Sequence, residues 1–227
     1  MKSIFTLIVG ALLLAGLAGC DSDTKSDENS EETSEKPVDV FPEFSQAFTS
    51  VDTERSESYA CSSMEYPNGT PLDHSFMQQL FGEVLLKQAT YKETYDYYPL
   101  GTFPFTARQT GYLLGAYESE SFYSSHLFLY DSTRNAFTHT LSLNYFIGEG
   151  AFESKREAWL TDLNDDGVTD VMYRAMESYT PEDEYYEGGY SRDTLYAQVW
   201  DGDVFSPYSL EDYEGAKLAF EIPIDTE

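Results

Sequence analysis

Four oxygen-bearing side chains and a glycine follow one another at a regular spacing in the second half of the chain. Asp162, Asn164, Asp166 and Asp170 occupy relative positions 1, 3, 5 and 9, and Gly167 occupies position 6. Ca²⁺ is a hard cation that takes roughly 6 to 8 oxygen ligands, and alternate residues can point inward only where a glycine lets the chain turn sharply. The spacing therefore predicts a loop that binds one structural Ca²⁺ through these four side chains.

The residues after this loop favour a strand. Residues 168–175 alternate with a period of two, which is typical of a half-buried strand. Tyr173 stands at position 12, where an EF-hand carries a bidentate glutamate. The segment instead resembles the DxDxDGxxD loops of FG-GAP (VCBS-like) repeats, and this resemblance implies a calcium loop that precedes a β-strand of a propeller blade. The alternative is a solvated acidic turn that binds no metal.

The start of the chain has the pattern of an export signal. Lys2 precedes an apolar run from Ile4 to Leu17, and a run this short predicts a signal peptide over residues 1–19. The sequence Leu-Ala-Gly-Cys that ends at Cys20 resembles the bacterial lipobox. The resemblance implies cleavage before Cys20 and acylation of that residue, which anchors the protein to a membrane surface. An ordinary signal peptide that happens to end at a cysteine is the alternative.

Charge and composition limit the partners of the mature chain. Residues 20–40 are mostly acidic and small polar residues without an aromatic, which predicts a disordered tether. The formal net charge of the whole chain is −28, so nucleic acid is disfavoured, because phosphate contacts need clustered Lys and Arg. A basic protein is the partner that this charge would attract. The alternative is that the charge serves only solubility or reflects a salty habitat.

The sequence predicts one β-rich domain over residues 41–227. A strand or two is expected over residues 41–71, and a single short helix follows, capped by Asp73 and ended by Gly82. Residues 84–105 suit either helix or strand. Later segments rich in apolar and aromatic residues predict antiparallel strands, over 112–117, 126–130, 137–143, 155–163, 168–175, 194–200 and 204–208. Apolar residues alternate with Thr and Ser over 137–143. The fold class is therefore mainly β with antiparallel sheets, and a small or irregular propeller is one form that this class can take.

A weak internal repeat accompanies these strands. Leu129-Tyr130-Asp131, a turn and Phe137 resemble Val199-Trp200-Asp201, a turn and Phe205. Two hairpins of a propeller or of a meandering sheet would give this pattern.

An acidic, tyrosine-rich loop is the best candidate for contact with a partner. Asp183, Tyr185, Tyr186 and Tyr190 lie between Pro181 and Tyr190 beside two glycines. Tyrosine is favoured at interfaces, and glycines let a loop adapt. A flexible solvated loop is the alternative.

No motif predicts catalysis. The three histidines lack metal-ligand spacing, and Cys61 has no neighbouring base that could activate it. These observations favour an exported, lipid-anchored cell-envelope protein that acts as a non-catalytic binding, inhibitor or immunity-type module for a basic protein. The sequence leaves open which membrane carries the anchor and the oligomeric state. An envelope glycan hydrolase with a carboxylate pair and a purely structural surface lipoprotein are the alternatives.

Overall fold

The computed structural model describes residues 40–52, 69–119, 122–180 and 189–210. By their contacts, all the described residues belong to one compact unit. Three short helices come first: α1 (Phe41–Gln46), α2 (His74–Leu80) and α3 (Glu83–Gln88). Eight strands follow: β1 (Asp96–Pro104), β2 (Gln109–Ser119), β3 (Phe122–Asp131), β4 (Ala136–Glu149), β5 (Phe152–Thr161), β6 (Asp170–Tyr179), β7 (Tyr190–Trp200) and β8 (Phe205–Tyr208).

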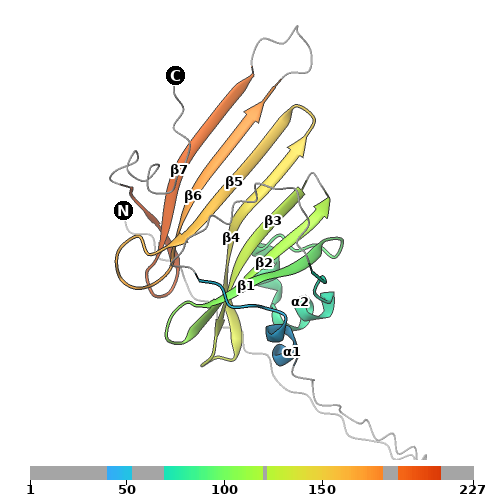
Figure 1. Cartoon of the computed structure of the whole chain (residues 1–227), viewed down its shortest axis with the longest axis vertical. Coiled ribbons are helices and arrows are strands. Elements are labelled where there is room, and N and C mark those ends of the chain that lie inside the picture. Colours follow the sequence, from blue (N-terminus) through green and yellow to red (C-terminus); the bar gives the residue numbers. More distant parts are fainter. Residues whose placement is uncertain (1–39, 53–68, 120–121, 181–188, 211–227) are drawn as a thin grey trace, which may run out of the picture. The chain divides into compact units, whose positions relative to one another are not determined.

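The strands form a single antiparallel sheet, and the prediction of a mainly β fold is confirmed. The spatial order of the strands is their order in the sequence, so each described strand pairs with the next (Figure 1). The two segments of the weak repeat end β3 and β7 and lead into β4 and β8. They are thus two hairpins of one meandering sheet, and the described strands are not divided into separate propeller blades.

The helices pack against β1–β4 around an aromatic core (Figure 1). Phe44 of α1 is fully buried, and its ring centroid lies 4.8 Å from that of Phe48 and 5.7 Å from that of Phe81. The strand expected over residues 41–71 is wrong for Phe41–Gln46, which are helical. Phe41 and Phe44 are three residues apart, so the helix places both on one face. Phe48 follows just after the helix, and Pro42 lies in the first turn, where proline is tolerated.

A second core joins the two ends of the sheet. It contains buried residues from β1 to β7, among them Leu113, Leu127, Val171 and Trp200. The ring of Phe105, just after β1, lies 5.3 Å from Trp200 at the end of β7. Because these strands are far apart in the sheet order, the sheet must curl to bring them together. This curling places the β1–β2 turn beside the β5–β6 loop that carries the predicted calcium ligands.

Arg156 of β5 contacts β4 at Ser142 and Leu143, beside an irregularity in the pairing of β4 with β3. Its Nε donates to the Leu143 carbonyl at 2.7 Å, and its Nη2 donates to the Ser142 carbonyl at 2.8 Å. The guanidinium lies 4.9 Å from the ring centroids of both Tyr145 and Tyr173. Near this point the register of β3 against β4 shifts between Ser124 and His126. Arg156 therefore couples β4 to β5 and β6 through carbonyl and cation–π contacts.

Candidate metal centre

The predicted calcium loop connects β5 to β6. Thr161 and Asp170 are paired across the two strands and close the hairpin. Within the loop Asp165 has φ +59° and Gly167 has φ +80°, and a glycine adopts this left-handed conformation without the cost of a Cβ. The prediction that the loop is followed by a strand is confirmed by β6. Tyr173, at position 12, is buried in the second core, so its side chain belongs to the packing of the sheet.

The loop orients its exposed oxygen ligands through its own amides. Asp162 accepts N–H groups from Asp166 at 3.1 Å and Gly167 at 2.7 Å. Asn164 Oδ1 accepts from the Asp166 amide at 3.2 Å, and Asp166 Oδ1 accepts from the Val168 amide at 2.8 Å. Each hydrogen bond uses only part of the accepting capacity of its oxygen. These side chains are therefore positioned and still have lone pairs available for a cation.

Asp170 is different from the other three predicted ligands because it is fully buried. Its Oδ2 accepts the Leu163 amide at 3.0 Å, and its Oδ1 accepts the Trp200 amide at 2.9 Å. Burial raises the pKa of Asp170, these two hydrogen bonds oppose the rise, and the carboxylates of Asp166 and Asp162 add to it. Asp170 thus ties the loop to the end of β7 and lies in the negative field of two other predicted ligands.

The chemistry of these residues fits a hard cation. Asp162, Asn164, Asp166 and Asp170 offer only oxygen acceptors, apart from the Asn164 amide nitrogen, which donates to Asp166 Oδ2 at 3.0 Å. A bound Ca²⁺ would offset the repulsion of Asp170 by the carboxylates of Asp162 and Asp166. In the described conformation no three His, Cys, Asp or Glu side chains converge as a complete ligand group. The assignment of Ca²⁺ to this loop stays a prediction.

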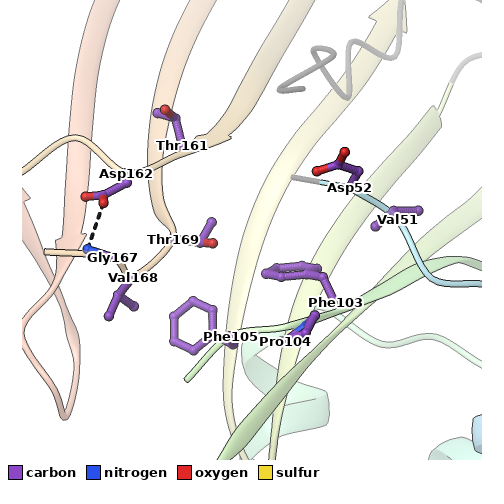
Figure 2. Close-up of a pocket in the computed structure, with 10 residues that line it drawn as sticks. All are labelled: Val51, Asp52, Phe103, Pro104, Phe105, Thr161, Asp162, Gly167, Val168 and Thr169. Carbon is purple, nitrogen blue, oxygen red and sulfur yellow. Dashed lines mark hydrogen bonds between the residues drawn. The ribbon is translucent and has the colours of Figure 1, made fainter. Parts of the chain in front are cut away.

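Two pockets lie on either side of the loop, and Val168 lines both. The Phe103 pocket has a volume of about 550 Å³ and is lined by 51–52, 103–105, 161–162 and 167–169 (Figure 2). The Trp200 pocket has a volume of about 530 Å³ and is lined by 106–109, Asn164, Asp166, Val168 and 199–202. Asp162 therefore faces one pocket, and Asn164 and Asp166 face the other.

The predicted partner loop is described only at its end. Tyr190 begins β7, is 51% exposed and stacks on the 37% exposed Tyr179, with ring centroids 6.2 Å apart. Asp183, Tyr185 and Tyr186 lie outside the described residues. This exposed tyrosine pair lines neither of the two pockets beside the calcium loop.

Other sequence features fall outside the description as well. Residues 1–39, with the signal peptide, Cys20 and most of the tether, and Cys61 are not described. Among the described helices, none is both long and apolar enough to span a membrane.

The histidines make separate, local contacts. His74 Nδ1 lies 3.2 Å from the Tyr91 hydroxyl, and His126 Nε2 lies 3.1 Å from Ser124 Oγ. The ring of His139 packs edge-on to Trp200 at 5.1 Å.

The described carboxylates differ in the direction of their pKa shifts. Burial raises the pKa of Asp170, whereas hydrogen bonds lower the pKa values of Asp73, Asp131 and Asp201. Both oxygens of Asp170 accept backbone amides, which is the arrangement of a structural carboxylate.

The pocket residues Asp52, Phe103, Phe105 and Trp200 were missed from the sequence. Their segments are separated by about 50 to 100 residues along the chain and meet only because the sheet curls. No spacing signal connects them.

Comparison of the chain with protein-family models, with curated proteins and with solved structures finds no match.

Proposed function

We propose that this chain is a lipid-anchored envelope protein whose calcium-stabilised β domain binds a basic protein without catalysing a reaction. Cys20 is the proposed anchor, and the predicted tether over residues 20–40 separates it from the domain. The observation that carries the binding role is the pair of acid-lined pockets beside the predicted calcium loop. Asp52 lines one pocket and Asp201 lines the other, and neither of these aspartates belongs to the predicted calcium ligands.

Charge distribution supports a basic partner. The chain has 41 acidic and 13 basic residues. Two of its cations are paired within the domain: Arg174 with Asp193 at 2.6 Å, and Lys155 with Glu157 at 2.7 Å. The remaining negative field would steer a cationic protein toward the surface and repel an anionic one.

The proposed role of Ca²⁺ is structural. The ion would join Asp162, Asn164, Asp166 and Asp170, and these residues also form or support the walls of both pockets. Extracellular modules bind Ca²⁺ at about 10⁻⁴ to 10⁻³ M, so an exported domain would be filled by ambient calcium. Neutralising these carboxylates would hold the loop between the two pockets in one conformation.

Affinity capture tests the binding role. The full-length protein, immobilised in nonionic detergent with CaCl₂, is incubated at low salt with an envelope extract of the source cell. We expect basic proteins to be retained specifically and to be released in about 0.5 M NaCl, because the Debye screening length is then only a few ångströms. A protein immobilised at the same density but with positive net charge serves as the control. Recovery of no protein, or of an acidic set, would contradict the proposed function.

A further inference from the structure

We propose that a third pocket of the domain binds one carboxylate group of the basic partner through Arg108. This inference rests on the proposed function and specifies a contact that orients the partner. The Arg108 pocket lies where the β1–β2 turn meets the β3–β4 turn (Figure 1) and is lined by Ser50, 102–104, 106–110 and Ser132. Its volume of about 350 Å³ lies within the usual range of ligand pockets, roughly 300 to 1,000 Å³.

The Arg108 pocket differs in charge from the two pockets beside the calcium loop. No aspartate or glutamate is among the described residues that line it, and Arg108 is the one charged residue among them. The side-chain amide of Gln109 and several hydroxyl groups also line it. The described residues that carry these hydroxyls are Ser50, Thr102, Thr106, Thr110 and Ser132. In a chain with 41 acidic and 13 basic residues, this pocket has a local charge opposite to the net charge, and it favours an anionic group.

The main chain of Arg108 is held by both turns. Its amide donates to Thr106 Oγ1 at 3.3 Å, and its carbonyl accepts the amide and the hydroxyl of Ser132, each at 3.0 Å. The side chain is exposed, and its guanidinium forms no ion pair or hydrogen bond with another described residue. The backbone of Arg108 is therefore positioned, while its five N–H donors remain available to a ligand.

The carboxylates that lie near this guanidinium have donors of their own. Asp131, which precedes the β3–β4 turn, accepts the amides of residues 133–134. The Trp200 pocket, which Arg108 also lines, contains Asp166 and Asp201. Asp201 accepts the amides of residues 203–204, and Asp166 is a predicted calcium ligand. An ion pair with Arg108 is therefore not needed to satisfy any of these three groups.

A carboxylate suits the Arg108 pocket better than other anions. The planar fork of a guanidinium matches the two oxygens of a carboxylate. The hydroxyls of Ser50 and Thr110 donate to no described acceptor and can add hydrogen bonds to such a ligand. A phosphate monoester carries about −1.5 to −2 charges at pH 7, so a single arginine would leave part of that charge exposed to the negative field of the chain. A carboxylate has one charge, which Arg108 matches.

This contact gives orientation more than attraction. The negative field of the domain draws a basic protein toward the surface without selecting one pose, whereas a point of opposite sign fixes the register of an interface. A basic protein also carries carboxylates, and only poses that place one of them at Arg108 satisfy both charges.

A set of small probes tests the Arg108 pocket directly. The full-length ¹⁵N-labelled protein, held in nonionic detergent with CaCl₂ at constant ionic strength, is titrated with Nα-acetyl-glutamate methylamide, its neutral glutamine counterpart and methyl phosphate. We expect the glutamate probe to shift the Arg108 Nε–Hε signal and the Thr110 amide signal saturably, and the glutamine probe to bind roughly fivefold more weakly. Equal binding of these two probes, tighter binding of methyl phosphate, or shifts elsewhere only would overturn the inference.

Three variants separate the fork of Arg108 from its charge. Arg108→Gln keeps the main-chain contacts of the turn and should weaken the glutamate probe roughly fivefold. Arg108→Lys keeps the charge without the fork and should give an intermediate loss. Arg134→Gln is the matched control, because this side chain in the adjacent turn is 68% exposed and does not line the pocket. Its affinity should stay within about twofold of the wild type, and a loss equal to that of Arg108→Gln would overturn the inference.

Affinity capture distinguishes this inference from the proposed function. Arg108→Gln should retain less basic envelope protein than the wild type or Arg134→Gln at the same salt concentration. If the wild type captures basic proteins and Arg108→Gln captures them equally well, the pocket inference fails and the proposed function stands. If the glutamate probe binds through Arg108 but the wild type captures no basic protein, the proposed function fails.

Discussion

Asp170→Ala should lower the free energy of unfolding in calcium-free buffer by about 3 kcal/mol, since a buried N–H left without a partner costs about 1–3 kcal/mol and the part-buried Leu163 N–H adds a smaller loss. Asp170 is fully buried and accepts the amides of Leu163 and Trp200. Alanine would leave both donors unpaired and would also release the β5–β6 loop from the end of β7. Urea unfolding followed by tryptophan fluorescence measures the loss, because Trp200 lies at the affected contact.

The control for this substitution is Asp203→Ala in the exposed turn between β7 and β8. The backbone amide of Asp203 donates to Asp201, and alanine retains that amide, so the free energy of unfolding should change by less than about 0.5 kcal/mol. A loss below about 1 kcal/mol in Asp170→Ala would show that water replaces the carboxylate. The structural role assigned to Asp170 would then be wrong.

His126 should make the domain less stable as the pH falls from 6.5 to 4. Burial, and then the positive charge of Arg156, lower the pKa of His126 from 6.5 to about 4. In this window the unfolded chain binds a proton that the folded chain excludes, so the free energy of unfolding decreases with falling pH. The pKa difference corresponds to a loss of about 3 kcal/mol by pH 4.

His126→Gln isolates this contribution. Glutamine stays neutral at every pH in the window and can still form a hydrogen bond at the position that faces Ser124. Carboxylates titrate in both proteins, so the difference between their pH profiles measures His126 alone. The variant should lose about 3 kcal/mol less stability than the wild type between pH 6.5 and 4. Parallel profiles would mean that His126 gains a proton in the folded state as readily as in the unfolded chain.

Much of the sheet could be predicted from local pattern. Apolar and aromatic runs indicated β2 and β3, alternation of apolar residues with Thr and Ser indicated β4, and Asp201-Gly202 indicated the last hairpin, where Gly202 has φ +102°. Strand ends were less predictable, because β4 continues beyond Leu143 through pairing with β3 as far as Ile147 and with β5 as far as Glu149. The ambiguous residues 84–105 divide into α3 and β1, and the register of β1 shifts between Pro99 and Gly101. Proline cannot donate to a ladder, so it is accommodated at such an irregularity.

The candidate site could be predicted only in part. The loop at 162–170 follows from spacing within one short segment, and its turn at Gly167 and the strand after it are as expected. The burial of Asp170 could not be predicted, because it depends on the Trp200 amide from a strand 30 residues away. The pockets depend on tertiary structure in the same way. Local spacing predicts a loop, whereas a pocket whose walls come from distant strands requires the curled sheet.

Thermal unfolding with and without calcium is the most direct test of the central claim, that Asp162, Asn164, Asp166 and Asp170 bind a stabilising Ca²⁺. The protein is melted in EDTA, in about 10 mM CaCl₂ and in about 10 mM MgCl₂, with Asp166→Ala alongside. At a concentration about 100 times Kd, binding to the folded state adds about 2.7 kcal/mol, which corresponds to a rise of Tm of roughly 5–10 °C. We predict this rise for calcium in the wild type, a smaller rise for magnesium, and none in Asp166→Ala. Identical melting curves in EDTA and CaCl₂ would show that the loop is an acidic turn without a metal.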